Sequence, residues 1–92
     1  MAVARMFDCK GWTPEQYDAL MNELGFGPGV AGPGVLFHWA GPTPEGMQAV
    51  DVYESRAAAD RLASEHVGRA AQKLGLPLPE ITEHEVRNFV PA

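Results

Sequence analysis

The stretch GVLFHWAGPTPEGMQAVDVYES, residues 34–55, decides the fold of this 92-residue chain. It contains two runs rich in β-branched and aromatic residues, 35–40 and 46–54, joined by a short loop with proline and glycine. This pattern predicts two antiparallel strands that form a hairpin. Each strand carries one polar side chain near its middle, His38 in the first and Asp51 in the second. A histidine and a carboxylate inside a sheet need a physical explanation.

The register of the two strands decides which side chains share a face. Side chains alternate across a sheet, so pairing His38 with Asp51 places both on one face. That face then carries Leu36, His38, Ala40, Met47, Ala49, Asp51 and Tyr53. The opposite face carries Val35, Phe37, Trp39, Gln48, Val50, Val52 and Glu54. A slip of one residue would instead join the aromatic set to Asp51. We favour the first register because the loop length allows it and because it brings the two polar groups together.

A helix is predicted before the hairpin, over residues 14–24. Thr13 has the position of an N-cap, and Gln16 completes a capping box three residues later. Pro14 occupies the first helical position, where its missing N–H costs nothing, and Gly25 follows the last turn. The apolar stripe of this helix consists of Tyr17, Leu20, Met21 and Leu24.

A longer helix is predicted after the hairpin, over residues 56–74. Ser55 has the position of its N-cap, and Gly75 stops it. Its apolar stripe consists of Ala59, Leu62, Ala63, His66, Val67, Ala70, Ala71 and Leu74. Because His66 belongs to this stripe, we expect it to face the sheet.

One further strand is predicted at each end of the chain, over residues 2–9 and 80–90. The order is therefore βαββαβ, which is typical of a ferredoxin-like sandwich, an α+β fold. We expect a single domain, residues 1–92, with a four-stranded antiparallel sheet and both helices on one face. The helices would leave the other, equally apolar face of the sheet uncovered, which predicts that a second copy of the chain packs there.

Composition excludes several classes of function. The net charge is −5 and the seven Lys and Arg residues are dispersed, which argues against nucleic-acid binding. The chain contains no long apolar run, so we expect no membrane partner and a cytoplasmic location. Cys9 is the only cysteine, and the three histidines are far apart in sequence, so neither an internal disulfide nor a metal site is expected.

The segment VDVYESRAAADRLASEH, residues 50–66, resembles the dimeric α+β barrel superfamily, and within it the small antibiotic-biosynthesis-monooxygenase-like proteins. The shared feature is a third strand that runs through an aromatic residue, Tyr53, into a helix capped by Ser55. The resemblance implies a homodimer with a small-ligand cavity between sheet and helices. It also implies cofactor-free oxidation of polyketide quinols, ring formation or haem degradation. Haem-degrading relatives carry an asparagine on the first strand, where this chain has Arg5 and Asp8, so no cofactor is expected.

The candidate catalytic residues are His38 and Asp51, because a carboxylate that binds one imidazole nitrogen makes the other a general base near neutral pH. The alternative is a core histidine whose polar atoms are satisfied by a neighbouring acid. Candidate ligand-binding residues are Tyr17, Leu36, Met47, Tyr53 and His66. We expect a protein that binds a small apolar or aromatic molecule, either as a cofactor-independent monooxygenase or cyclase/isomerase, or as a non-catalytic binding or assembly module.

Overall fold

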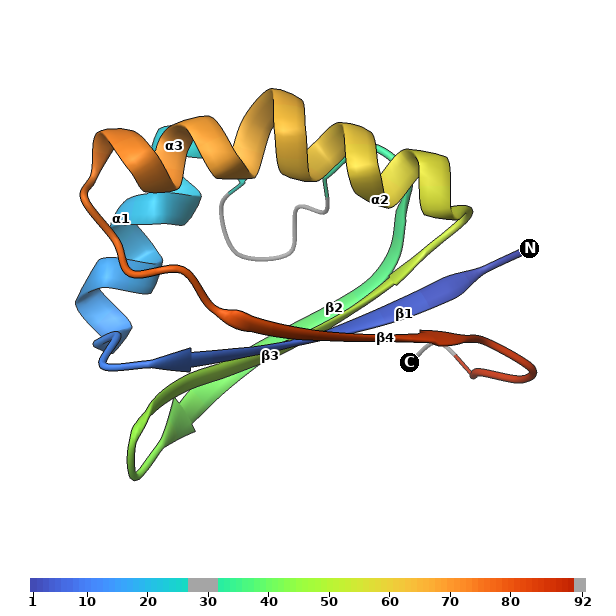
Figure 1. The fold of residues 1–92 in the computed structure, drawn as a ribbon, viewed down its shortest axis with the longest axis horizontal. Helices are drawn as coiled ribbons and strands as arrows, with labels where there is room; N and C mark the ends of the chain where they lie inside the picture. Colours follow the sequence, from blue (N-terminus) through green and yellow to red (C-terminus); the bar gives the residue numbers. More distant parts are fainter. Residues whose placement is uncertain (27–31, 91–92) are drawn as a thin grey trace.

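The computed structural model of the protein describes residues 1–26 and 32–90. Its elements are β1 (Val3–Lys10), α1 (Pro14–Leu24), β2 (Val35–Thr43), β3 (Gly46–Tyr53), α2 (Arg56–Leu62), η1 (Ala63–Val67), α3 (Gly68–Lys73) and β4 (Glu80–Glu85). The sheet has the order β2-β3-β1-β4, and every neighbouring pair is antiparallel. All helical segments lie on one side of this sheet (Figure 1). The predicted ferredoxin-like α+β fold is confirmed.

Both helices begin as the sequence predicts. The Thr13 hydroxyl accepts a bond from the Gln16 backbone N–H at 3.1 Å, and the Gln16 side chain accepts one from the Thr13 N–H at 2.9 Å. The Ser55 hydroxyl accepts a bond from the Ala58 N–H at 3.0 Å. These caps satisfy backbone donors that a helix start leaves without partners.

The hairpin has the favoured register, with His38 opposite Asp51. Strand β2 continues to Thr43 and does not end at residue 40, and it is paired through Pro42. Proline is tolerated there because β2 lies at the edge of the sheet, where one side of the backbone has no partner strand. The register shifts between Val35 and Phe37.

The second helix contains one turn of π-helix, η1, between α2 and α3, and the three segments form one continuous rod (Figure 1). The N–H of Gly68 donates to the carbonyl of Ala63, five residues earlier. A Cβ on residue 68 would lie 2.7 Å from that carbonyl oxygen, so glycine permits the wider turn. The inserted residue changes the phase of the buried stripe, which steps from Leu62 to Val67 and then to Ala70.

Strand β4 ends at Glu85, not at residue 90 as predicted. Within the described sheet its only neighbour is β1, and Glu85 pairs with Val3, the first residue of that strand. Beyond this point β4 has one more backbone bond, from the Val86 N–H to the Ala2 carbonyl at 3.0 Å. The strand stops because its partner begins there.

The core lies between the sheet and the helices, in two clusters. The first contains Cys9, Trp12, Leu20, Met47 and Ala70, and the second contains Val3, Tyr53, Ala59 and Leu62. The Trp12 indole donates to the carbonyl of Pro77 at 3.0 Å, which ties the start of α1 to the segment before β4. No described helix is long and apolar enough to cross a membrane.

The face of the sheet without helices carries a row of apolar side chains. Trp39 lies opposite Val50, and Val50 lies opposite Met6 across the next ladder. Trp39 and Met6 are 43% and 39% exposed.

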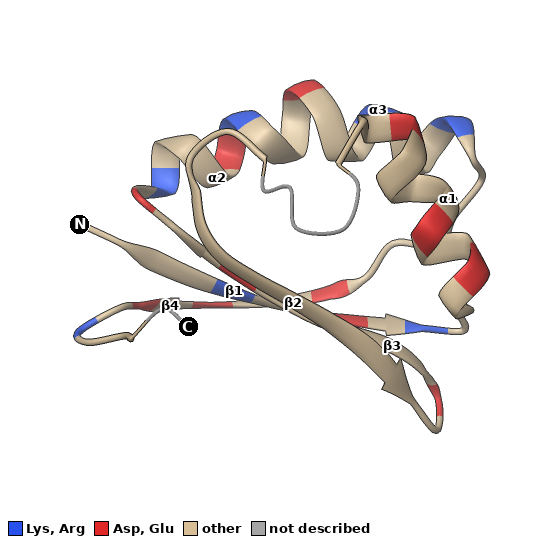
Figure 2. Cartoon of the chain, turned by 180° about the vertical axis from the view of Figure 1, so that it is seen from behind, with Lys and Arg blue, Asp and Glu red and all other residues tan. Residues whose placement is uncertain are grey.

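The lysine and arginine residues are spread over the helices and strands and do not gather on one element (Figure 2).

Candidate functional site

Four polar side chains form one hydrogen-bonded chain on the helix-facing side of the sheet. His38 on β2 and Asp51 on β3 are opposite each other, and the Nδ1 of His38 is bonded to Oδ1 of Asp51. With Asp51 as a carboxylate, Nδ1 carries the proton and Nε2 holds the lone pair. The hydroxyl of Tyr17 on α1 lies 2.6 Å from Nε2 and is therefore its donor. The histidine is held between a carboxylate and a phenol.

Tyr53 completes the chain from the buried end. Its hydroxyl donates to Oδ2 of Asp51 at 2.7 Å, so both carboxylate oxygens have a donor. Burial raises the pKa of the Tyr53 phenol, and the charge of Asp51 raises it further. The guanidinium of Arg5 lies 5.9 Å from the Tyr53 ring centre and is itself bonded to Glu83 at 2.9 Å. These contacts fix the position of the carboxylate before any ligand arrives.

Tyr17 and His38 meet edge to edge. Their ring planes are 5° from parallel and their centres are 6.2 Å apart. Because the planes are nearly parallel, the gap between them cannot exceed about the 2.6 Å that separates Oη from Nε2. Overlapping rings need a wider gap, about 3.5 Å between carbon atoms. The phenol is therefore bonded to the imidazole roughly within the imidazole plane.

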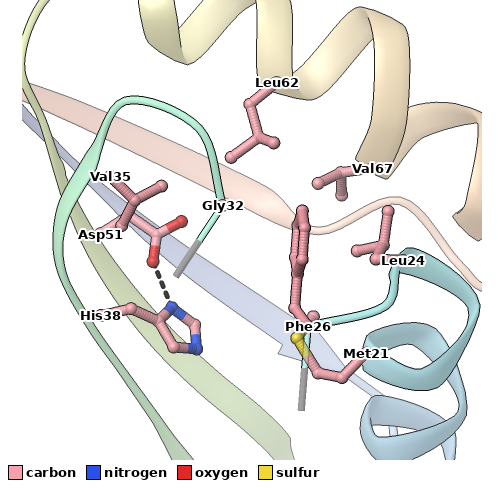
Figure 3. A pocket seen from close by; sticks show the side chains of 9 residues that line it. All are labelled: Met21, Leu24, Phe26, Gly32, Val35, His38, Asp51, Leu62 and Val67. Atoms are coloured by element: carbon pink, nitrogen blue, oxygen red, sulfur yellow. Dashed lines mark hydrogen bonds and ion pairs between the residues drawn. The ribbon is translucent and has the colours of Figure 1, made fainter. Parts of the chain in front are cut away.

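A hollow borders this histidine and carboxylate, between the sheet and the helices (Figure 3). Its lining consists of Met21, Leu24, Phe26, Gly32, Val35, His38, Asp51, Leu62 and Val67. Apart from the histidine and the carboxylate, these side chains are apolar. The hollow has a volume of about 50 Å³, which is room for a few water molecules at roughly 10–15 Å³ each.

Two solved structures share the fold over nearly the whole chain. One is SnoaB, a cofactor-independent oxygenase from Streptomyces nogalater, in its N63A mutant, with a TM-score of 0.62 and 20% identity over 99% of this chain and 96% of the other. The chain has the fold of the antibiotic-biosynthesis-monooxygenase-like proteins. The second structure, assigned as such a monooxygenase from Deinococcus radiodurans, has a TM-score of 0.59 and 14% identity over 100% and 98% of the two chains. No family model and no curated protein matches the sequence.

Within this antibiotic-biosynthesis-monooxygenase-like fold, the structure confirms the predicted pairing of His38 with Asp51 and adds two partners. Tyr17, expected at a ligand, instead contacts His38. Tyr53, also expected at a ligand, is buried and contacts Asp51. Neither tyrosine lines the hollow.

Two other predicted ligand residues lie away from the hollow. Leu36 is 46% exposed, because the register shift after Val35 takes it out of the alternation, and Val35 lines the hollow in its place. Met47 lies on the expected face but is packed in the core with Cys9 and Trp12.

His66 does not face the sheet, so that expectation is wrong. The π-turn places Val67, not His66, one turn after Leu62, and His66 is exposed. It lines a separate surface hollow of about 230 Å³. The other residues of that hollow are Glu23, Leu24, Glu65, Arg69, Ala70 and Lys73. Among the described residues, no cluster suited to a metal ion is present.

The apolar lining of the hollow was only partly visible in the sequence. Met21 and Leu24 belong to the stripe of the first helix, and Leu62 and Val67 to that of the second. Both apolar stripes were expected to face the sheet that carries His38, and this could have been used to predict that their residues line a hollow beside it. Phe26 lies beyond the end of α1, where no periodic pattern reaches.

Proposed function

We propose that this protein binds a small, largely apolar aromatic molecule beside His38 and oxidises it without a cofactor. The observation that carries the proposal is the His38–Asp51 pair at the border of an otherwise apolar hollow. An imidazole with one nitrogen bonded to a carboxylate is a general base at neutral pH. The oxygenase activity named for SnoaB, which shares the fold, supports the same reaction class.

In this mechanism His38 is the base and Asp51 orients it. Nε2 removes the proton of a ring hydroxyl, and the resulting anion is electron-rich enough to react with O₂ at a ring carbon. The peroxide formed there loses water as the ring carbon gives up its hydrogen and the histidine returns its proton. In sum, a phenol with a ring C–H and one O₂ give a quinone and one water, so O₂ is the only oxidant required.

The size of the hollow sets a condition on binding. A cavity that holds one benzene ring measures about 150 Å³, and this hollow measures about 50 Å³. A ring must therefore displace side chains as it binds. Two aromatic side chains border this site, since Tyr17 is bonded to His38 and Phe26 lines the hollow.

A non-catalytic binding module is the second candidate. It is favoured by one observation, namely that both nitrogens of His38 already have partners within the chain. Such a protein would bind the aromatic molecule in the same place and leave it unchanged.

The two candidates differ in oxygen consumption. We expect the wild type to consume O₂ with 1-naphthol and to form 1,4-naphthoquinone. His38→Ala should lower the rate by about 10²–10⁴-fold, the usual contribution of a general base. His66→Ala is the matched control, because His66 is exposed on the helical layer and does not line the hollow beside His38. Binding of naphthol without oxygen uptake would favour the binding module, and absence of both would refute the proposal.

We also propose that the protein is a homodimer that packs through the uncovered face of the sheet. Its central row, Trp39, Val50 and Met6, is apolar and lies across three strands. Exposed apolar rows of this kind mark protein interfaces. A second copy would bury the row against itself and would leave the hollow of each chain on the outer, helical side.

A further inference from the structure

The atom that the proposed mechanism needs is already occupied. Nε2 of His38 is the nitrogen with the lone pair, and the Tyr17 hydroxyl lies 2.6 Å from it. Nδ1 is bonded to Asp51, whose second oxygen holds Tyr53. Of these contacts, only the one from Tyr17 comes from a different layer of the fold, since α1 packs over the sheet.

We propose that Tyr17 is a specificity-determining residue, and that a phenolic ligand binds by displacing the Tyr17 hydroxyl from Nε2 of His38. This inference rests on the proposed function, which already takes a phenol as substrate, and adds a role for Tyr17. The Tyr17 hydroxyl keeps Nε2 from weaker donors, and it is displaced by a ligand that donates in the same way.

The geometry of Tyr17 shows which ligands fit. Its phenol approaches the imidazole edge to edge, with planes 5° from parallel. A phenolic O–H lies in the plane of its own ring, so an aromatic hydroxyl reproduces this approach. The C–H next to a carbonyl is removed along a direction perpendicular to the carbonyl plane, which would place that plane across the imidazole. Phenols are therefore favoured over carbon acids.

Displacement of Tyr17 is energetically accessible. The side chain is half-buried, and its hydroxyl makes one hydrogen bond. A neutral hydrogen bond of this kind contributes about 0.5–1.5 kcal/mol net, a factor of about 2 to 12 in an equilibrium constant. Burial raises the pKa of Tyr17, so the side chain stays a donor near neutral pH and does not itself become the base. Asp51 and Tyr53 keep their contacts when Tyr17 moves.

The test uses 4-methylphenol and its methyl ether, 4-methylanisole, under nitrogen at about pH 7.5, where an ordinary phenol is neutral and a free imidazole has lost its proton. The two probes have the same ring, but only methylphenol has a hydroxyl to donate. We expect Tyr17→Phe to lower the Kd of methylphenol about 2- to 12-fold and to leave that of methylanisole unchanged. Tyr17→Ala, which also removes the ring, should lower the methylphenol Kd at least as much. His38→Ala should abolish the preference for methylphenol.

Each other outcome has a defined meaning. A methylphenol Kd that is unchanged or raised in both Tyr17 variants overturns the inference, because removal of a competing donor must strengthen binding. Equal binding of both probes by the wild type, with no effect of His38→Ala, also overturns it but leaves an aromatic-binding protein. If neither probe binds to any variant, both this inference and the proposed function fail.

Discussion

At the scale of single residues, Asp51 is the central acceptor of the site. It is 9% exposed, and its two oxygens accept from two different rings. Asp51→Asn replaces one acceptor by an NH₂ donor, which must face either His38 Nδ1–H or the Tyr53 hydroxyl. Leaving a buried donor without an acceptor costs about 1–3 kcal/mol. We expect a loss of that size in urea unfolding, whereas exposed Asp18→Asn should change stability by less than about 0.5 kcal/mol. Equal effects of the two substitutions would contradict this assignment.

Cys9 gives a pH-dependent prediction at the same scale. Burial raises its pKa from 9.0 to about 11, and the charge of Asp8 acts in the same direction. The folded state thus holds the thiol proton more tightly than the unfolded state. The associated stability is complete below pH 9.0 and is lost as pH rises toward about 11. We expect the unfolding free energy to fall more steeply there than in Cys9→Ala, by up to about 1.4 kcal/mol per pH unit. If the unfolding free energies of the wild type and Cys9→Ala changed in parallel with pH, the pKa of Cys9 would be the same in the folded and unfolded states.

The sequence limited the hairpin to two registers but did not decide between them. Alternation and loop length allowed His38 opposite Asp51, and a slip of one residue stayed open; the structure has the register that was favoured because it pairs the two polar groups. The bonds from Tyr17 and Tyr53 were not foreseeable. They depend on side-chain rotamers and on how closely α1 packs over the sheet, which no periodicity encodes.

At the scale of elements, the helix after Ser55 shows where periodicity fails. A regular helix places His66 on the buried stripe, but one π-turn moves it to the surface and brings in Val67. Gly68 was the one residue in this helix that signalled a departure, since glycine inside a helix is costly unless a close approach requires it. Helix caps, by contrast, are local, and both were predicted correctly.

Gly68→Ala tests the π-turn. In an ordinary exposed helix this substitution stabilises by about 0.5–1 kcal/mol. Here the new Cβ would lie 2.7 Å from the Ala63 carbonyl oxygen. We therefore expect a loss of about 1–3 kcal/mol, as for other overpacked sites, measured by urea unfolding against the exposed Gln72→Ala. A gain in stability would show that the helix accepts a methyl group at this position without strain.

At the scale of the whole molecule, the ferredoxin-like fold class followed from the sequence, whereas the dimensions of the hollow did not. The order of elements along the chain reflects connection lengths and apolar patterns, and it limits the arrangements that a sheet can adopt. A hollow of about 50 Å³ is the small space left between nine residues from several elements, and a change of one rotamer can fill it. Function therefore has to be argued from side-chain contacts, because this fold alone does not fix a reaction.

The uncovered face of the sheet carries the last prediction. The helices cover one face of the sheet, and the other face carries the apolar row of Trp39, Val50 and Met6. A chain of 92 residues also has only a small core of its own. We expect sedimentation equilibrium at micromolar concentration to give twice the mass of the chain. Trp39→Glu places a charge in the central row, beside Val50, where a second copy would desolvate it. This variant should sediment as a monomer at the same concentration, whereas Leu78→Glu, at a residue that is 93% exposed and lies outside the sheet, should remain dimeric. Because His38 and Asp51 lie on the opposite face, the Trp39→Glu monomer should still bind methylphenol if its chain remains folded. A wild-type monomer, or a Trp39→Glu dimer, would mean that the apolar row serves a purpose other than self-association.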